Sequence, residues 1–282
     1  MGNVIRIAKK EFADLLGNRI VFLLLAIFAV IIILNAQGID DYMDYMSSGL
    51  VMWDMYGNSV SNLLLGSILT CLTFFGEFVG VIVGFSIFAG DRYSYSLNTL
   101  LVKPLYRDSI INGKLLGALG FLACICGFTI MLSVACMLIF AGNYAAPYLL
   151  EFLSRLPLVF LVVLAFMMIY MALSMLLSLV IPEQSLALIS ILLLVVIINS
   201  ANAVDVAAPF GVFFNSSLAT KLVAGLSPHV IRDHIYNAGL FNPSYDFFSA
   251  LSVAKFDILW MVLYAVIPVL FSYIVFLRRD VS

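Results

Sequence analysis

The stretch of sequence that decides the fold runs from Leu156 to Ile181 and reads LPLVFLVVLAFMMIYMALSMLLSLVI, 26 residues without a charged side chain. A helix needs about 20 predominantly apolar residues to cross the hydrocarbon core of a bilayer. The run therefore predicts one membrane-spanning helix. Pro182 follows it directly and marks the boundary with the next apolar run, because proline disfavours a continuing helix.

The composition of the whole chain agrees with this prediction. Of its 282 residues, 64% are hydrophobic and 11% are charged, and the mean hydropathy is +1.13. Soluble globular domains are about 45–50% apolar and about 25% charged, and they need charged residues to cover their surface. The composition excludes that class and favours a protein whose surface faces lipid. The net charge of −2 gives no electrostatic argument for a nucleic-acid partner.

Five further apolar runs extend the same pattern along the chain. Together the predicted spans cover residues 20–36, 63–89, 115–141, 156–181, 186–204 and 258–277. We therefore expect an all-α integral membrane protein with about six transmembrane helices in one domain, residues 20–282. The first run is the shortest and resembles a signal peptide. The nineteen residues before it and the lack of a small-x-small cleavage site favour an uncleaved span.

The distribution of Lys and Arg predicts the orientation, because cytoplasmic loops carry an excess of basic residues. With the N-terminus inside, ten of the fourteen Lys and Arg residues fall in cytoplasmic segments. The outer loop between the first two spans, residues 37–62, holds Asp40, Asp41, Asp44 and Asp54 and no basic residue. We expect both termini to be cytoplasmic and the chain to be a multi-pass protein of the cell membrane.

Residues 1–19 have the pattern of an amphipathic helix that lies on the inner leaflet. An apolar stripe recurs at helical spacing, and most of the basic residues lie off it; a positive-inside flank that happens to be helical is the plainer alternative. The stripe consists of Ile5, Ala8, Phe12, Leu15 and Leu16, and the basic residues are Arg6, Lys9 and Lys10. We expect an N-terminal interfacial helix.

The outer segment 205–257 contains apolar stretches that are too short to span a bilayer, such as Phe210–Phe214 and Leu218–Leu226. Because unpaired backbone groups are not tolerated in lipid, such stretches indicate re-entrant or interfacial helices packed against protein. His229 and His234 are five residues apart and do not share one helical face, so a metal pair would need ligands from elsewhere.

The four cysteines all fall inside apolar runs, where cysteine packs as a small hydrophobic residue. They are Cys71, Cys124, Cys126 and Cys136, and their spacing is not that of a metal site. We expect no metal or cofactor in this chain.

Glycines at intervals of four predict close helix packing. Gly76, Gly80 and Gly84 form one smooth stripe on the second span, and Gly113 and Gly117 repeat the pattern at the start of the third. Small residues at this spacing let helix backbones approach closely in lipid. Glycine is also generally common in membrane helices, but the regular spacing favours a packing face.

Glu77 is the one carboxylate well inside a predicted span. A charge at that depth costs on the order of 3 kcal/mol on insertion scales. We therefore expect the side chain to face the bundle interior, to be protonated or to pair with another group. Two interpretations stay open, a pathway or gate residue and a structural inter-helix hydrogen bond.

Motifs for catalysis or nucleotide binding do not occur in this sequence. It has no G-x-x-x-x-G-K-[ST], H-E-x-x-H or G-x-S-x-G. We expect no enzymatic activity in this chain. If the protein transports actively, the energy comes from a separate ATPase or from an ion gradient.

The longest predicted cytoplasmic loop, Asp91 to Lys114, reads DRYSYSLNTLLVKPLYRDSIINGK. It resembles the loop after the second helix of ABC-2-type transporter permeases, and the six-span layout extends the resemblance over essentially the whole chain. The matching residues are Asp91, Arg92, Leu97, Lys103, Pro104, Arg107, Gly113 and Lys114. Tyr95 and Ser96 stand where the family usually has Gly-Thr, and Asp91 stands where Glu is commoner.

The resemblance implies a permease subunit of an ABC transporter, for export or transmembrane transport, that couples to an ABC ATPase subunit, which binds ATP and Mg²⁺. It also implies a second permease copy, as a homodimer or with a paralogous chain. The chain is most similar to permeases for multicopper-enzyme or nitrous-oxide-reductase maturation. As a coupling helix, Ser96–Val102 would bury Leu97, Leu100 and Leu101 in the ATPase, while Arg92, Lys103 and Arg107 pair with acids at the rim and Pro104 ends the helix.

Three other functions compete with this interpretation. An ion-driven secondary transporter or channel would need intramembrane charges in corresponding halves of the chain, and the spans offer Glu77. An intramembrane enzyme would need a catalytic cluster, which the sequence does not indicate. A non-transporting assembly factor for a periplasmic or extracellular metalloprotein is not separated from export by the residues.

Overall fold

The computed structural model describes residues 2–45, 60–93, 107–200, 227–242 and 245–278, and within these ranges it is helical and has no strand. Five helices are long and apolar enough to cross a membrane. The described elements, in chain order, are α1 Gly2–Leu16, α2 Arg19–Tyr45, α3 Val60–Tyr93, α5 Arg107–Phe140, α6 Gly142–Ala145, the 3₁₀ turn Ala146–Tyr148, α7 Leu149–Val180, α8 Gln184–Ser200, α11 Pro228–Asn237 and α12 Phe247–Arg278. The predicted all-α membrane protein is confirmed.

The long helices extend beyond the predicted spans. α2 reaches Tyr45, nine residues past the predicted end at 36, and α12 begins at Phe247, eleven residues before the predicted start at 258. Hydropathy marks where the hydrocarbon ends, whereas a helix continues for as long as its backbone groups find intrahelical partners. The outer segment predicted over 205–257 therefore includes the first turns of α12.

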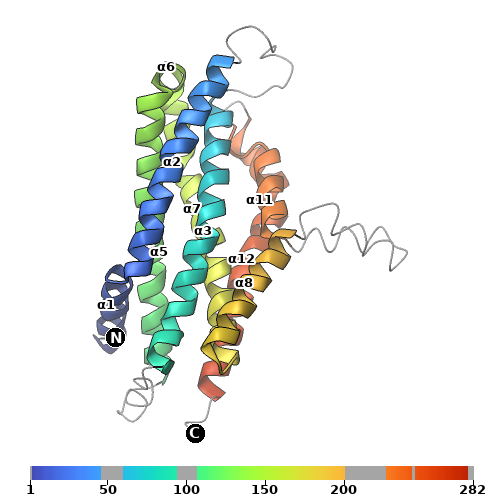
Figure 1. Cartoon of the computed structure of the whole chain (residues 1–282). Coiled ribbons are helices and arrows are strands. Elements are labelled where there is room, and N and C mark those ends of the chain that lie inside the picture. Colours follow the sequence, from blue (N-terminus) through green and yellow to red (C-terminus); the bar gives the residue numbers. More distant parts are fainter. Residues whose placement is uncertain (1, 46–59, 94–106, 201–226, 243–244, 279–282) are drawn as a thin grey trace.

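The described part of the fifth predicted span, 186–204, belongs to α8, and residues 201–204 lie outside the described residues. α8 has 17 residues, which at 1.5 Å per residue gives about 26 Å, less than the roughly 30 Å of a bilayer core. Figure 1 shows α8 in the lower half of the bundle and α11 in the upper half. The described helices α8 and α11 thus lie at different depths of the bundle (Figure 1).

The centre of the bundle is formed by α3 and α7, which pack along much of their length. The three glycines of the second span lie on this contact, where a Cβ at Gly80 or Gly84 would clash with a backbone carbonyl oxygen of α7. A Cβ at Gly76 would meet the side chain of Met167 at 2.9 Å. Only glycine allows the two backbones to approach this closely.

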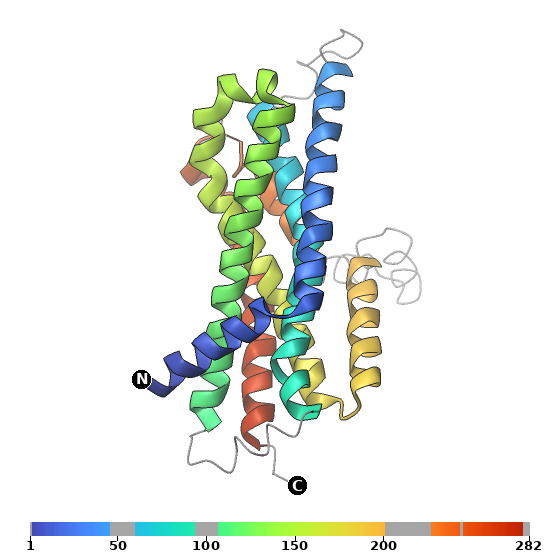
Figure 2. The same cartoon turned by 60° about the vertical axis from the view of Figure 1, so that its left-hand side comes forward.

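The N-terminal helix α1 crosses α5 at a steep angle (Figure 2). Ala8 and Leu15 are buried in this contact, while Arg6, Lys9 and Lys10 are exposed. Ile5 and Leu16, which the sequence placed on the same apolar stripe, are exposed as well. The helix therefore packs on α5 through a narrower face than its sequence pattern predicts.

The start of α1, the last turn of α12 and the facing ends of α3 and α5 lie toward the same end of the bundle, which we call the inner end (Figure 1). This is the end that the distribution of Lys and Arg predicts to be cytoplasmic. The side chains of α11, at the opposite half, pack against α3 and α12.

Candidate functional site

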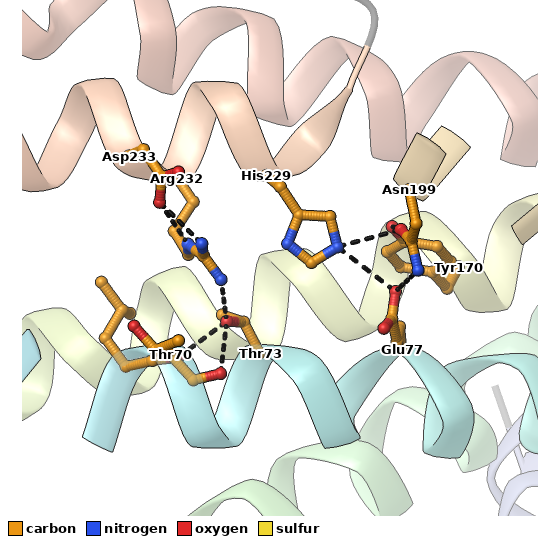
Figure 3. A network of polar contacts seen from close by, with 9 residues as sticks. Thr70, Thr73, Glu77, Tyr170, Asn199, His229, Arg232 and Asp233 are labelled. Atoms are coloured by element: carbon orange, nitrogen blue, oxygen red, sulfur yellow. Dashed lines mark hydrogen bonds and ion pairs between the residues drawn. The ribbon is translucent and has the colours of Figure 1, made fainter. Parts of the chain in front are cut away.

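A cluster of buried polar side chains lies halfway along α3, between four helices. Glu77 of α3 is fully buried, and it meets Tyr170 of α7, Asn199 near the end of α8 and His229 at the start of α11 (Figure 3). Asn199 is the second-last residue of α8, and His229 is the second residue of α11. The two short helices therefore meet at this cluster.

The distances define how these groups are joined. The Nδ2 amide of Asn199 donates to Glu77 Oε2 at 3.0 Å, and the Tyr170 hydroxyl donates to Asn199 Oδ1 at 3.1 Å. His229 Nε2 lies 3.0 Å from Asn199 Oδ1 and 3.4 Å from Glu77 Oε2. Both of these oxygens are acceptors, so this arrangement assigns the imidazole hydrogen to Nε2.

Glu77 is only half satisfied by this cluster. Its second oxygen, Oε1, has no hydrogen-bond partner among the residues that the structure describes. Buried polar atoms are normally paired, and an unpaired one costs about 1–3 kcal/mol. The N-terminus of α11, which carries His229, contributes a partial positive charge near the carboxylate. Glu77 thus joins α3 to three other helices, while its Oε1 atom has no hydrogen-bond partner among the described residues.

One turn away, α11 makes a second polar contact with α3. The Arg232 guanidinium donates from NH1 to Thr73 Oγ1 at 2.8 Å, and from Nε and NH2 to the carboxylate of Asp233 at 2.9 and 2.6 Å (Figure 3). Thr73 in turn donates to the carbonyl of Leu69 at 2.7 Å. Arg232 is 8% exposed. Its charge is compensated by Asp233, whose side chain is partly exposed.

These contacts form a two-rung ladder, which we call the α3–α11 ladder and define as Thr73, Glu77, His229 and Arg232. Thr73 and Glu77 are four apart on α3, and His229 and Arg232 are three apart on α11, so each pair shares one helical face. The sequence interpretation found Glu77 but missed the other three. The spacing of His229 and Arg232 was the available signal, whereas the pair considered was His229 with His234.

His234 lies apart from this ladder. It is largely exposed, and its Nδ1 is 3.5 Å from Asp257 of α12. Within the described ranges, no group of three or more His, Cys, Asp or Glu side chains is placed to hold a metal ion. The two histidines thus belong to different surroundings.

A second buried polar contact joins α1 to the bundle near its inner end. Lys114 of α5 donates from Nζ to Glu11 of α1 at 2.8 Å and to the Ile87 carbonyl of α3 at 2.7 Å. The side chains of Lys114 and Glu11 are 5% and 11% exposed. We call Glu11, Ile87 and Lys114 the α1 junction, because they tie the N-terminal helix to two membrane-spanning helices.

The α1 junction shows the surroundings of Lys114, whose role in coupling to an ATPase stays a prediction. The sequence grouped it with residues that face an ATPase, but the structure places its ammonium inside the protein, where Glu11 compensates the charge. Gly113 and Gly117 flank it and pack on α1. A Cβ at Gly113 would lie 2.7 Å from Ile7 Cβ, and one at Gly117 would lie 2.6 Å from the Ala8 carbonyl oxygen.

The remaining residues of the predicted coupling loop are placed only in part. Asp91 and Arg92 belong to the last turn of α3, and Arg107 is the first residue of α5. Five others lie outside the described residues, namely Leu97, Leu100, Leu101, Lys103 and Pro104. The loop therefore connects two helices whose described ends lie at the inner end of the bundle.

Comparison with known families agrees with this architecture. The model of the ABC-2 family transporter proteins matches residues 5–281, nearly the whole chain. The chain belongs to the ABC-2 transporter family. It is a multi-pass membrane protein and the membrane component of a transporter. No curated protein matches the sequence.

Proposed function

We propose that this ABC-2 family protein is the permease subunit of an ABC exporter in the cell membrane. Two copies, or this chain and a paralogous one, enclose the pathway, and a separate ATPase subunit binds ATP and Mg²⁺. The family match over residues 5–281 and the motif pattern of the loop from Asp91 to Lys114 support this proposal.

The observation that carries the proposal is the α1 junction. Ile87 lies six residues before the end of α3, and Lys114 lies seven residues after the start of α5. The junction therefore clamps the two helices on either side of the loop 94–106 and fixes both to α1. A partner that displaces this loop moves α1, α3 and α5 together.

α3 carries that displacement to the middle of the bundle. It is one helix from Val60 to Tyr93, with the α1 junction near one end and Glu77 at its centre. A shift of α3 changes its contacts with the ends of α8 and α11, where His229 and Asn199 meet the carboxylate. Since these contacts join helix ends, they break with little change in helix structure. We assign this position as the access gate.

The test is co-purification with the ATPase encoded beside this gene. We expect a stable complex with the wild-type chain and its loss in the double variant Leu100→Asp, Arg107→Glu, because the variant buries one charge and reverses another at the interface. Lys255→Glu is the matched control, an exposed charge reversal on α12 away from the inner end. A double variant that binds and stimulates the ATPase normally would contradict the interface.

An ion-driven transporter is the second candidate, favoured by the buried ionisable groups Glu77, His229 and Arg232. It predicts uptake or efflux in proteoliposomes that follows an imposed ion gradient without any ATPase. The ABC assignment predicts no such flux unless the ATPase and ATP are present.

A further inference from the structure

A cavity of about 580 Å³ lies between α1, α3, α5 and the first half of α8, at the inner half of the bundle. We call it the α1–α8 pocket. One wall is a turn of α3 with Val81, Ile82 and Phe85, and the facing wall is a turn of α8 with Leu188 and Ile191. Its volume and mainly apolar lining are those of small-molecule sites, which measure roughly 300–1,000 Å³.

We call the side of this pocket between α2 and α8 its mouth; that side is apolar, whereas the exposed residues Asp14 and Gln184 lie elsewhere on the lining. Ile20 at the start of α2 and Leu188 and Leu192 of α8 line the mouth, and all three are exposed. Ile20 belongs to α2, which is long and apolar enough to cross a membrane, and the two leucines belong to α8, a shorter apolar helix. Entry between these two apolar helices favours a molecule that comes from the hydrocarbon of the membrane over a fully water-soluble solute.

The end of the pocket next to α1 is polar and carries a net negative charge. Glu11 and Lys114 compensate each other across 2.8 Å. Asp14 adds an exposed carboxylate, and Asn18 and Gln184 add amide groups. The three charged lining residues thus sum to a formal charge of −1, which matches a cationic head and opposes an anionic one.

The head group must account for most of the difference in affinity between one amphiphile and another. An aliphatic chain that passes from lipid into the pocket leaves one apolar environment for another, so its burial contributes little free energy. The carboxylate of Asp14 is exposed, and an ion pair of that kind changes affinity by about two- to fivefold. The affinity of a ligand for the pocket should therefore depend more on the charge of its head than on the length of its chain.

We propose that the α1–α8 pocket binds single-chain amphiphiles with a cationic head that enter from the inner leaflet, and that this is the substrate class of the exporter. The chain lies between α3 and α8, and the head lies beside Asp14. The role of these amphiphiles as substrates rests on the proposed function, whereas their binding to the pocket does not require an ATPase.

The test uses the full chain alone in nanodiscs of phosphatidylcholine, with a photoactivatable, alkyne-tagged hexadecylamine as the probe. We expect the probe to label peptides of α3 and α8, and excess hexadecylamine to abolish this labelling. Hexadecyl sulfate and lysophosphatidylcholine should compete with the probe about three- to fivefold less well than hexadecylamine. Equal competition by lysophosphatidylcholine would mean an ordinary lipid site, and equal or better competition by the sulfate would reverse the charge argument. Either outcome overturns the proposal.

Two variants of α8 locate the labelling. Leu188→Trp narrows the mouth and is expected to lower labelling by about tenfold. Leu193→Trp is the matched control, because Leu193 is also exposed on α8 but does not line the pocket. Equal labelling of the two variants would overturn the proposal. Asp14→Asn should lower labelling about two- to fivefold and remove the preference for the amine over the sulfate.

Failure of this proposal and failure of the ABC assignment give different results. Labelling of the pocket in a chain that binds no ATPase would support the binding site and contradict the assignment as an exporter. A permease–ATPase complex whose ATP hydrolysis rises with hexadecylamine in the wild type and not in Leu188→Trp supports both. A complex with no labelled pocket removes the substrate class alone.

Discussion

The α1 junction and the α3–α11 ladder are both buried polar contacts on α3, yet they are built in opposite ways. In the junction, Lys114 Nζ donates to the Glu11 carboxylate at 2.8 Å and to the Ile87 carbonyl at 2.7 Å. Beside it, Gly113 and Gly117 allow α1 to pack closely on α5. In the ladder, Glu77 makes contacts of 3.0 and 3.4 Å to residues at helix ends, and Oε1 has no partner among the described residues.

The difference indicates that these two regions of α3 have different functions. A compensated, tightly packed ion pair resists separation, because breaking it leaves a buried charge. Glu77 lies between the ends of α8 and α11, and one of its carboxylate oxygens has no hydrogen-bond partner among the described residues. Less interaction free energy is therefore lost when those helices move. The junction is thus suited to transmit a displacement, and the ladder is suited to yield to one.

The largest effect is expected at the junction. Lys114→Met removes the ammonium that compensates the buried Glu11 carboxylate and should lower the free energy of unfolding by about 3–5 kcal/mol, measured as a drop in the thermal unfolding temperature of the purified protein. The double variant Lys114→Met, Glu11→Leu should recover most of that loss, because two apolar side chains leave no uncompensated charge. A single variant as stable as wild type would remove the contrast between the two regions.

A smaller effect is expected from the glycine contact beside the junction. Gly117→Ala places a Cβ 2.6 Å from the Ala8 carbonyl oxygen and should cost about 1–3 kcal/mol, since a backbone has to shift. Gly38→Ala is the matched control, because a Cβ there meets nothing within 4 Å. The same thermal assay should give an unchanged or slightly higher value for the control, and equal losses at both positions would contradict the packing argument.

The smallest effect on stability is expected in the ladder. Glu77→Gln keeps an oxygen for the amide of Asn199 and removes a charge that is only half satisfied, so the free energy of unfolding should change by less than about 1 kcal/mol. Coupling should suffer instead, seen as a lower stimulation of the partner ATPase in proteoliposomes. A loss of stability as large as that of Lys114→Met would show that both regions are structural clamps.

The sequence alone was sufficient for the long helices, because their hydropathy is a local property. It missed the polar contacts that join α11 to α3, because His229 and Arg232 read as charges of an outer segment. Their burial depends on Thr73 and Glu77, which are more than 150 positions away in the chain. Hydropathy contains no information on such partners.

Lys114 shows the same limit on a shorter scale. Its place beside Gly113 at the entry to the third span matched the loop motif, so the sequence assigned it to an ATPase interface. Its partner in the structure, Glu11, is 103 positions away on α1. The glycine spacing, in contrast, was informative, since a smooth stripe predicts a close approach whichever helix fills it.

The central claim is that ATP turnover at the inner end moves α11 relative to α3, and a reversible cross-link tests it most directly. Thr70 of α3 and Asp233 of α11 line the same cavity, so Thr70→Cys with Asp233→Cys in a cysteine-free background can be joined by a thiol-cleavable bifunctional reagent. We predict that the cross-link abolishes transport and ATPase stimulation and that reductant restores both to the level of the unlinked double variant. A cross-linked protein that transports at that level would contradict the account.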